Sequence, residues 1–183
     1  MWVSVIKESP WFVAIGGFRV KRVKNPKTLV GDISVAVAPY LAQIVDAEKV
    51  AGREHLFMAA VNAAKSTETG MAVSKSITVE ALLYASAQDQ ITRALRMLGV
   101  SPKSTTIALT VFAHSQEEVE LAYSKAAKHL GEEDDGVLEI DDLKAGYLKE
   151  TYGVGDEELR AVGGPEALGR LIIERGALLS LRR

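Results

Sequence analysis

A compact polar segment, residues 86–90 (SAQDQ), stands between two apolar helical patterns in the middle of the chain. Before this segment, Ser76 fits a helix N-cap and Glu80 lies near the positive end of the predicted helix. After it, apolar residues repeat at i, i+3, i+4 and i+7, and Gly99 is placed to end a second helix. A junction of this kind presents side-chain amides, hydroxyls and free backbone N–H groups to an approaching ligand.

The composition limits the classes of protein to which the chain can belong. Its 183 residues include 22 Lys and Arg against 24 Asp and Glu, which gives a net charge of -2. This balance argues against a protein that binds nucleic acid over its whole surface. A local basic patch remains compatible with that balance. The absence of cysteine excludes disulfides and thiolate chemistry. With no apolar run long enough to span a membrane and no signal-peptide core, we expect a cytoplasmic protein without membrane contact.

Strand and helix patterns alternate along the chain and define the expected fold. Strands are predicted at 2–6, 11–20, 40–47 and 105–113, and helices at 25–36, 53–65 and 115–130. This order predicts an α/β (α+β) fold, a single domain over residues 1–183 with a mixed β-sheet covered by helices. The Gly16-Gly17 pair predicts a bulge or bend in the second strand.

Five basic residues and no acidic residue lie between positions 19 and 27. They are Arg19, Lys21, Arg22, Lys24 and Lys27. The first interpretation is a solvated edge strand, which lysines protect against pairing with other chains. The alternative is a contact with a polyanion.

The sequence offers little support for catalysis. His55 is predicted to be a surface or half-buried histidine and not a catalytic base, because no carboxylate or nucleophile stands at a helical spacing that would orient it. The acidic run 132–135 lacks the ligand spacing of a calcium loop, so we expect no metal and no cofactor. Phosphate-binding glycine motifs, nucleophile elbows and H-E-x-x-H are absent. The competing hypothesis is a small metabolic enzyme or ligand-binding domain with a pocket around His55, Glu80 and Tyr84.

Several separated blocks resemble the small α/β regulatory subunit of the KEOPS (EKC) complex, the PRPK-binding protein (CGI-121) family. The blocks are DAEKV at 46–50, REHL at 53–56, Ser76 with Glu80, LYAS at 83–86, Gln90-Ile91, AL at 94–95, LGV at 98–100 and LIIERGALL at 171–179. The similarity covers residues from about 12 to 181, and the spacing of the blocks is more specific than any one of them.

The resemblance implies a non-catalytic partner protein. In this family the subunit docks on a small kinase-like ATPase, and the complex makes threonylcarbamoyladenosine beside the anticodon of tRNAs. Family members are also thought to hold the 3′ CCA end of tRNA. The partners implied are therefore the kinase-like ATPase subunit and tRNA, with no small-molecule substrate. A purely structural adaptor without RNA contact is a further possibility.

An RNA contact requires cations for phosphates, together with amides, hydroxyls and a flat ring for unstacked bases. The predicted RNA-binding residues are Lys65, Lys75, Tyr84, Ser86, Gln88, Gln90 and Arg93. This prediction requires the loop after Lys65 and the junction after Ser86 to lie on the same edge. In the alternative interpretation Tyr84 belongs to the core and the Ser and Gln side chains satisfy backbone groups. Archaeal relatives commonly have glycine and arginine at positions 87 and 89, and the carboxylate of Asp89 weakens a phosphate contact there.

A surface that docks a protein partner exposes more apolar area than a monomer otherwise does. The candidates are the small-residue face of the helix at 53–65 and the closing helix at 166–179. The predicted partner-binding residues on the closing helix are Leu168, Leu171, Ile172 and Leu178. Packing in the protein core explains either helix equally well.

Overall fold

The computed structural model describes residues 1–181, which form two compact units. The first unit comprises Met1–Ala47 and Gly99–Leu138. The second comprises Glu48–Leu98 and the chain from Glu139 onward. Each unit thus combines two segments that are distant in the sequence, and the expectation of a single domain stays a prediction.

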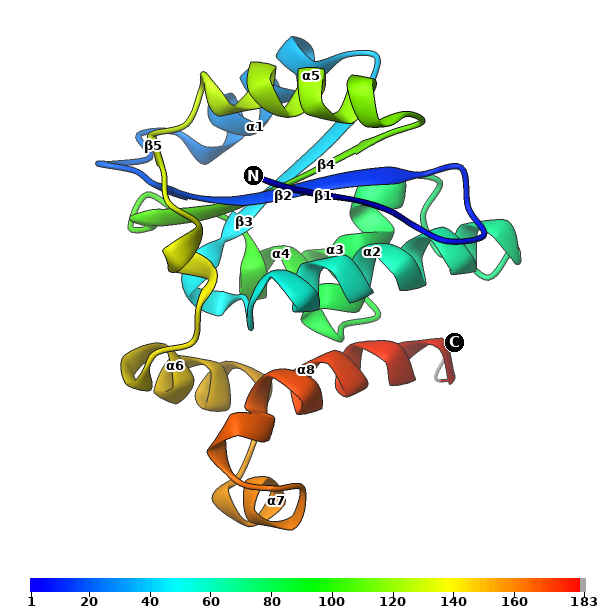
Figure 1. Cartoon of the computed structure of the whole chain (residues 1–183). Helices are drawn as coiled ribbons and strands as arrows, with labels where there is room; N and C mark the ends of the chain where they lie inside the picture. Colours follow the sequence, from blue (N-terminus) through cyan, green and yellow to red (C-terminus); the bar gives the residue numbers. More distant parts are fainter. Residues whose placement is uncertain (182–183) are drawn as a thin grey trace. The chain divides into compact units, whose positions relative to one another are not determined.

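An antiparallel sheet forms the centre of the first unit (Figure 1). Its strands lie in the order β1 (Trp2–Val5), β2 (Phe12–Arg19), β4 (Thr106–Ala113) and β3 (Leu41–Asp46), and the short β5 (Glu132–Glu133) pairs with the end of β2. The α+β class is confirmed. All pairings between these strands are antiparallel, where a mixed sheet was predicted.

Two helices, α1 (Pro26–Val37) and α5 (Gln116–Ala127), cover one face of this sheet (Figure 1). α1 begins after Asn25, whose side chain accepts hydrogen bonds from two backbone N–H groups of the first turn. α5 begins after Ser115, which caps the N–H of Glu118. Their buried sides pack on the sheet, and the residues that carry this core include Ile33, Val37, Val119, Ala122, Tyr123, Leu109 and Val111.

The two adjacent glycines of β2 allow a close approach from each face of the sheet. Pairing of β2 with β4 runs unbroken through both positions, so the predicted bulge is wrong. A Cβ at Gly16 would lie 1.9 Å from the hydroxyl oxygen of Tyr123, and a Cβ at Gly17 would lie 2.5 Å from a methyl carbon of Val137. Because successive strand residues face opposite sides, one glycine makes room for α5 and the other for the 3-10 turn η2 (Asp135–Leu138).

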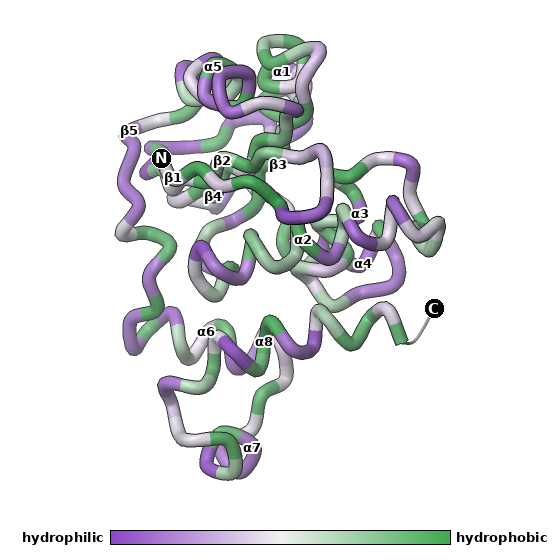
Figure 2. Tube along the Cα trace, turned by 45° about the vertical axis from the view of Figure 1, so that its right-hand side comes forward, coloured by the Kyte–Doolittle hydropathy of each residue, from purple (hydrophilic) through white to green (hydrophobic). Residues whose placement is uncertain are grey.

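Helices build the second unit, and their bounds are α2 Arg53–Glu68, α3 Ile77–Ser86, α4 Ile91–Leu98, α6 Asp142–Tyr152, α7 Asp156–Ala161 and α8 Leu168–Ala177. Two 3-10 turns accompany them, η3 (Pro165–Ala167) and η4 (Leu178–Leu181). A third, η1 (Ala47–Lys49), begins at Ala47 of the first unit and continues into the second. Hydrophilic and hydrophobic residues alternate along α6 and α8 (Figure 2). None of the helices in residues 1–181 combines the length and apolarity required to cross a membrane.

α3 is the buried helix of the second unit. Its residues from Glu80 to Ser86 are all buried, and α2, α4 and α8 pack around it. α8 approaches the backbone of α3 at Gly176, where a Cβ would lie 2.4 Å from the carbonyl oxygen of Tyr84. A glycine is therefore required for α8 to lie directly against the backbone of α3.

The fit of Tyr123 over β2 gives a direct test of the first unit. We expect Gly16→Ala to lower the free energy of unfolding by about 1–3 kcal/mol, because the added methyl group must displace the Tyr123 ring from a close-packed core. Urea denaturation measures the change. The matched control is Gly31→Ala in the exposed part of α1, where no atom lies within 4 Å of the new Cβ; it should stabilise the protein by about 0.5–1 kcal/mol. Equal effects of the two substitutions would contradict the packing described.

Candidate nucleic-acid interface

The polar junction between α3 and α4 is held by backbone hydrogen bonds. Ala87 adopts the left-handed conformation with φ 53°. Its N–H donates to the carbonyl of Tyr84 at 3.2 Å, and the N–H of Gln88 donates to the carbonyl of Leu83 at 3.1 Å. This is the Schellman arrangement, in which a residue other than glycine costs about 1–2 kcal/mol. The surrounding contacts therefore fix the junction before any ligand binds.

Two buried side chains converge on one carbonyl in the last turn of α3. Nε2 of His55 lies 2.8 Å from the carbonyl oxygen of Ala85, and the hydroxyl of Tyr152 lies 3.1 Å from the same oxygen. The Tyr152 hydroxyl is also 3.1 Å from the carbonyl oxygen of Lys49, so these two acceptors share its one proton. The α-helix leaves its last carbonyls without internal partners, and these bonds supply them. They also tie α2 and α6 to the end of α3.

His55 is buried, with 2% of its surface exposed, so its predicted surface or half-buried position is wrong. Its Nδ1 accepts a hydrogen bond from the Ala51 N–H at 3.1 Å, which places the ring proton on Nε2, facing Ala85. Burial lowers the pKa of His55 to about 4, and the positive charge of Lys144 acts in the same direction. The imidazole is therefore neutral at pH 7 and serves the structure.

The three residues of the alternative enzyme pocket are all buried. Glu80 is 0% exposed and accepts a hydrogen bond of 2.6 Å from the Ser74 N–H, which anchors the turn before α3. Tyr84 is 2% exposed inside α3. His55, Glu80 and Tyr84 thus contribute to the interior, which weighs against the enzyme hypothesis. Residues 1–181 also contain no cluster of three or more His, Asp and Glu side chains that could hold a metal ion.

The structure divides the predicted RNA-binding residues between the interior and the surface. Tyr84 and Ser86 lie in the interior, and the Ser86 hydroxyl donates to the carbonyl of Leu83 at 3.1 Å. A base cannot stack on the buried Tyr84 ring, and the buried Ser86 hydroxyl is bonded within α3, so the assignment of these two residues to an RNA contact is wrong. The alternative interpretation, in which they satisfy the core, fits their positions.

The remaining residues lie at opposite ends of α3. Lys65 and Lys75 are exposed near its beginning, in the last part of α2 and just before α3. Gln88, Gln90 and Arg93 are at least partly exposed near its end. A helix of this length separates the two groups by about 15 Å. The condition that both loops lie on one edge is therefore not met, and we take the group at the junction as the candidate interface.

A cavity of about 200 Å³ opens beside this junction. It is lined by Ser86, Ala87, Gln88, Met97, Thr151, Tyr152 and Arg175. The guanidinium of Arg175 is already engaged, because its Nη2 contacts both carboxylate oxygens of Glu158 at 2.7 and 2.9 Å and holds the pKa of that carboxyl below its usual range. The cavity is smaller than the roughly 300–1,000 Å³ of sites for whole ligands. It suits part of one nucleotide better than a cofactor.

Most of the predicted partner-binding residues belong to the core of the second unit. Leu168, Leu171 and Ile172 are 2%, 7% and 0% exposed, because this side of α8 packs within the unit. Their assignment to a docking surface is wrong for that reason. Leu178 is 46% exposed and lies on η4, three residues before Leu181, which is 79% exposed.

Residues 20–180 match the family model described as kinase binding protein CGI-121. The chain belongs to the CGI-121 family. A curated relative, the regulatory protein Cgi121 of Methanocaldococcus jannaschii, is 30% identical over 141 residues, which cover 77% of this chain and 84% of the relative. The family resemblance noted in the sequence is confirmed.

Sequence reasoning missed the groups that position the junction of this CGI-121 protein. The missed residues are Tyr152 and Arg175, which lie far along the chain from α3 and bind backbone carbonyls. A backbone carbonyl accepts hydrogen bonds whatever side chain its residue carries, so the sequence does not show which carbonyls these residues bind. Only the apolar pattern of α3 indicated that polar partners close to it would have to be buried.

The buried imidazole makes the stability of this CGI-121 protein depend on pH. The pKa of His55 is about 4 in the folded chain against 6.5 ordinarily, so its contribution is fully present above pH 6.5 and is lost as the pH falls towards 4. We expect His55→Gln to remove roughly 3 kcal/mol of this pH dependence, measured by urea denaturation between pH 7 and pH 4. His129→Gln, at an exposed histidine, should keep the wild-type profile. If His55→Gln also keeps it, the buried neutral imidazole is refuted.

Proposed function

We propose that this protein is a non-catalytic subunit of the KEOPS tRNA-modification complex, acting in the cytoplasm. It binds the kinase-like ATPase subunit and recruits tRNA through the 3′ CCA end for the synthesis of threonylcarbamoyladenosine. Membership of a kinase-binding family supports the protein partner. The observation that carries the tRNA assignment is the preformed polar junction, which opens onto a cavity suited to part of a nucleotide.

The junction supplies the groups that an unpaired RNA end requires. The amide side chain of Gln90 can donate to and accept from the edge of an unstacked base. The Nε2 of Gln88 lies 3.4 Å from the carbonyl oxygen of Ser86, so its amide oxygen and its second N–H remain for a base. Arg93, in the first turn of α4, is exposed and forms no ion pair with the residues described, so it is available to a phosphate. Asp89 is the opposing charge, because its exposed carboxylate repels a backbone phosphate. Binding at this site is therefore expected to be modest and sensitive to salt.

The kinase-like partner is proposed to dock on the apolar face of η4. Residues i and i+3 of a 3-10 helix eclipse one another, so Leu178 and Leu181 lie on one face. Both are large apolar side chains exposed to solvent, which is the composition expected of a docking surface. A second exposed apolar pair, Leu143 and Tyr147 on α6, offers the competing surface, with 84% and 59% exposed.

The RNA assignment predicts that the junction senses the CCA end. We expect Gln88→Ala combined with Arg93→Ala to weaken the binding of a CCA-ended tRNA about tenfold, because a phosphate contact and a base contact are lost together. The same variant should bind a tRNA without CCA as the wild type does. Fluorescence anisotropy with labelled transcripts measures both affinities.

Two further variants complete this test. Asp89→Arg should strengthen binding of the CCA-ended tRNA several-fold, since it replaces repulsion with attraction. Arg160→Ala removes an exposed cation from α7 and should have no effect on the preference for CCA. If removal of CCA leaves the affinity of the wild-type protein unchanged, the protein does not hold the 3′ end and the structural-adaptor alternative is favoured.

The docking assignment predicts that a charge on η4 disrupts the complex. We expect Leu178→Asp combined with Leu181→Asp to weaken binding to the ATPase subunit about 30-fold or more, because the interface would bury unpaired carboxylates. Co-purification and calorimetry measure the loss. Val35→Asp, at an exposed apolar residue of α1, is the control and should bind normally. Normal binding by the η4 variant together with loss in Leu143→Asp would instead assign the docking surface to α6.

A further inference from the structure

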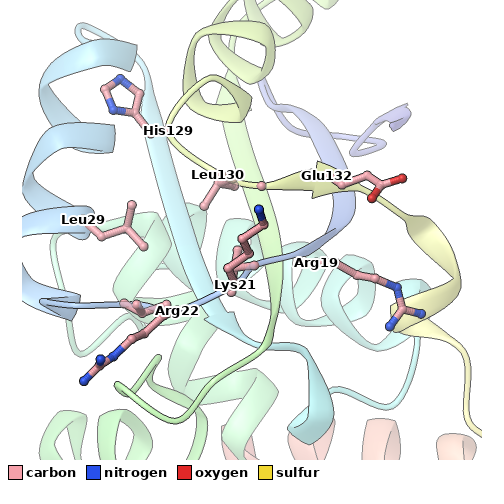
Figure 3. A pocket seen from close by; sticks show the side chains of 10 residues that line it. Arg19, Lys21, Arg22, Leu29, His129, Leu130 and Glu132 are labelled. Carbon is pink, nitrogen blue, oxygen red and sulfur yellow. The ribbon is translucent and has the colours of Figure 1, made fainter.

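A cationic groove with a volume of about 460 Å³ lies in the first unit (Figure 3). Its polar lining includes Lys21, Arg22 and His129, and its apolar lining includes Leu29 and Leu130. We call it the basic groove. It is formed by the end of β2 and the segment that follows, by α1, and by the chain that leads from α5 into β5. None of its residues belongs to the junction beside α3.

The structure rules out the first interpretation of the basic segment. β2 is not an edge strand, because it pairs with β4 on one side and with β1 and β5 on the other. Lys21, Arg22 and Lys24 follow the strand instead of lying along it. Protection of a sheet edge therefore cannot explain the concentration of positive charge.

The backbone on both sides of the basic groove is fixed. A Cβ at Gly131 would lie 1.9 Å from the carbonyl oxygen of Arg19, so the turn after α5 lies directly against the end of β2. The Val20 N–H donates to the carbonyl of Thr105 at 2.8 Å, and Val23 is 3% exposed and anchors the basic segment in the core. The groove is thus preformed and needs no ordering of a loop to accept a ligand.

The charges of the groove fall into two groups. Arg19 is neutralised by Asp134, whose carboxylate lies 2.6 Å from its Nε, and Figure 3 shows its side chain directed away from Lys21. Lys21 and Arg22 are exposed and form no ion pair with other residues of the described chain. Lys21 extends towards Leu130, whereas Arg22 lies on the side of Leu29 (Figure 3). Among the lining residues Glu132 is the opposing carboxylate, and its negative charge restricts a bound anion to the vicinity of Lys21 and Arg22.

We propose that the basic groove binds nucleotide phosphates, with a single strand of RNA as their source. Lys21 and Arg22 would meet two phosphates, while the flat guanidinium and the His129 ring are surfaces on which a base can stack. Leu29 and Leu130 supply apolar contact for a ribose or base. Sites for single-stranded nucleic acid typically combine cations with planar and apolar side chains. An acidic peptide would use the cations alone, so the planar and apolar lining favours RNA. The choice of RNA rests on the proposed function, and the phosphate chemistry rests on the groove itself.

The test uses the full chain and a labelled tRNA transcript that lacks CCA, so that the junction beside α3 does not contribute. We expect Lys21→Ala and Arg22→Ala each to weaken binding about five- to tenfold and to reduce the slope of log K against log salt by about 0.7. Lys7→Ala removes an exposed cation of the same unit before the opposite end of β2, and it should leave affinity and slope unchanged. Circular dichroism checks that each variant is folded.

Competitors separate the possible sources of the phosphate. Displacement of the transcript by adenosine monophosphate at low millimolar concentration would support binding of nucleotide phosphates. If the protein binds the mononucleotide but no transcript, the ligand is a free nucleotide and the RNA proposal is overturned. Competition by poly-glutamate as effective as that by an RNA of equal charge would overturn the proposal in favour of an acidic protein surface. Equal affinities for Lys21→Ala, Arg22→Ala and Lys7→Ala would overturn it outright. Because the transcript lacks CCA, failure here is distinct from failure of the proposed 3′-end recognition.

Discussion

One backbone carbonyl, that of Ala85, is the acceptor on which the second unit depends. It accepts a hydrogen bond from His55 Nε2 at 2.8 Å and lies 3.1 Å from the Tyr152 hydroxyl, and both contacts are buried. An unsatisfied carbonyl at this depth would cost about 1–3 kcal/mol, so the tyrosine must stay protonated in order to donate. The histidine stays neutral for two other reasons: it is buried, and its Nδ1 accepts a hydrogen bond from the Ala51 N–H, which a protonated ring cannot do. Burial accordingly lowers the pKa of His55 and raises that of Tyr152. The two side chains reach this acceptor from α2 and α6, and they position the left-handed turn at Ala87 that follows.

The same pattern, in which polar side chains are engaged within the unit, extends beyond Ala85. The ionisable groups near α3 are used within the unit: His55 and Glu80 bind backbone groups, and Arg175 binds Glu158. At the junction after α3, the surface presents the amides of Gln88 and Gln90 beside the charged side chains of Asp89 and Arg93. On η4 the surface presents Leu178 and Leu181. Those are groups for recognition, and they fit a protein whose family is defined by binding a kinase. Buried polar residues here give rigidity to the surface that a partner meets.

The sequence predicted the elements better than the environments of their side chains. Strand alternation, the Asn25 and Ser115 caps and the two helices around residue 87 were read correctly, because each signal is local. The burial of His55, Tyr84 and Ser86 depends on partners far along the chain, and helix periodicity does not report them. The same limit misassigned Leu168, Leu171 and Ile172, since apolar residues on a helix fit a core and an interface equally well. The glycine pair of β2 was interpreted as a bulge or bend, because glycine is known for its conformational freedom. The sequence does not show that Tyr123 packs against Gly16 and requires the space that a side chain would fill.

Hydrogen exchange of the full chain, with and without a CCA-ended tRNA, tests the central claim most directly. We expect tRNA to slow exchange of the amides in residues 88–93, while the buried amides of α2 and α3 keep the rates they have in the free protein. Unchanged exchange at 88–93, with protection appearing only elsewhere in the second unit, would contradict the claim that the junction after α3 is where this unit holds RNA.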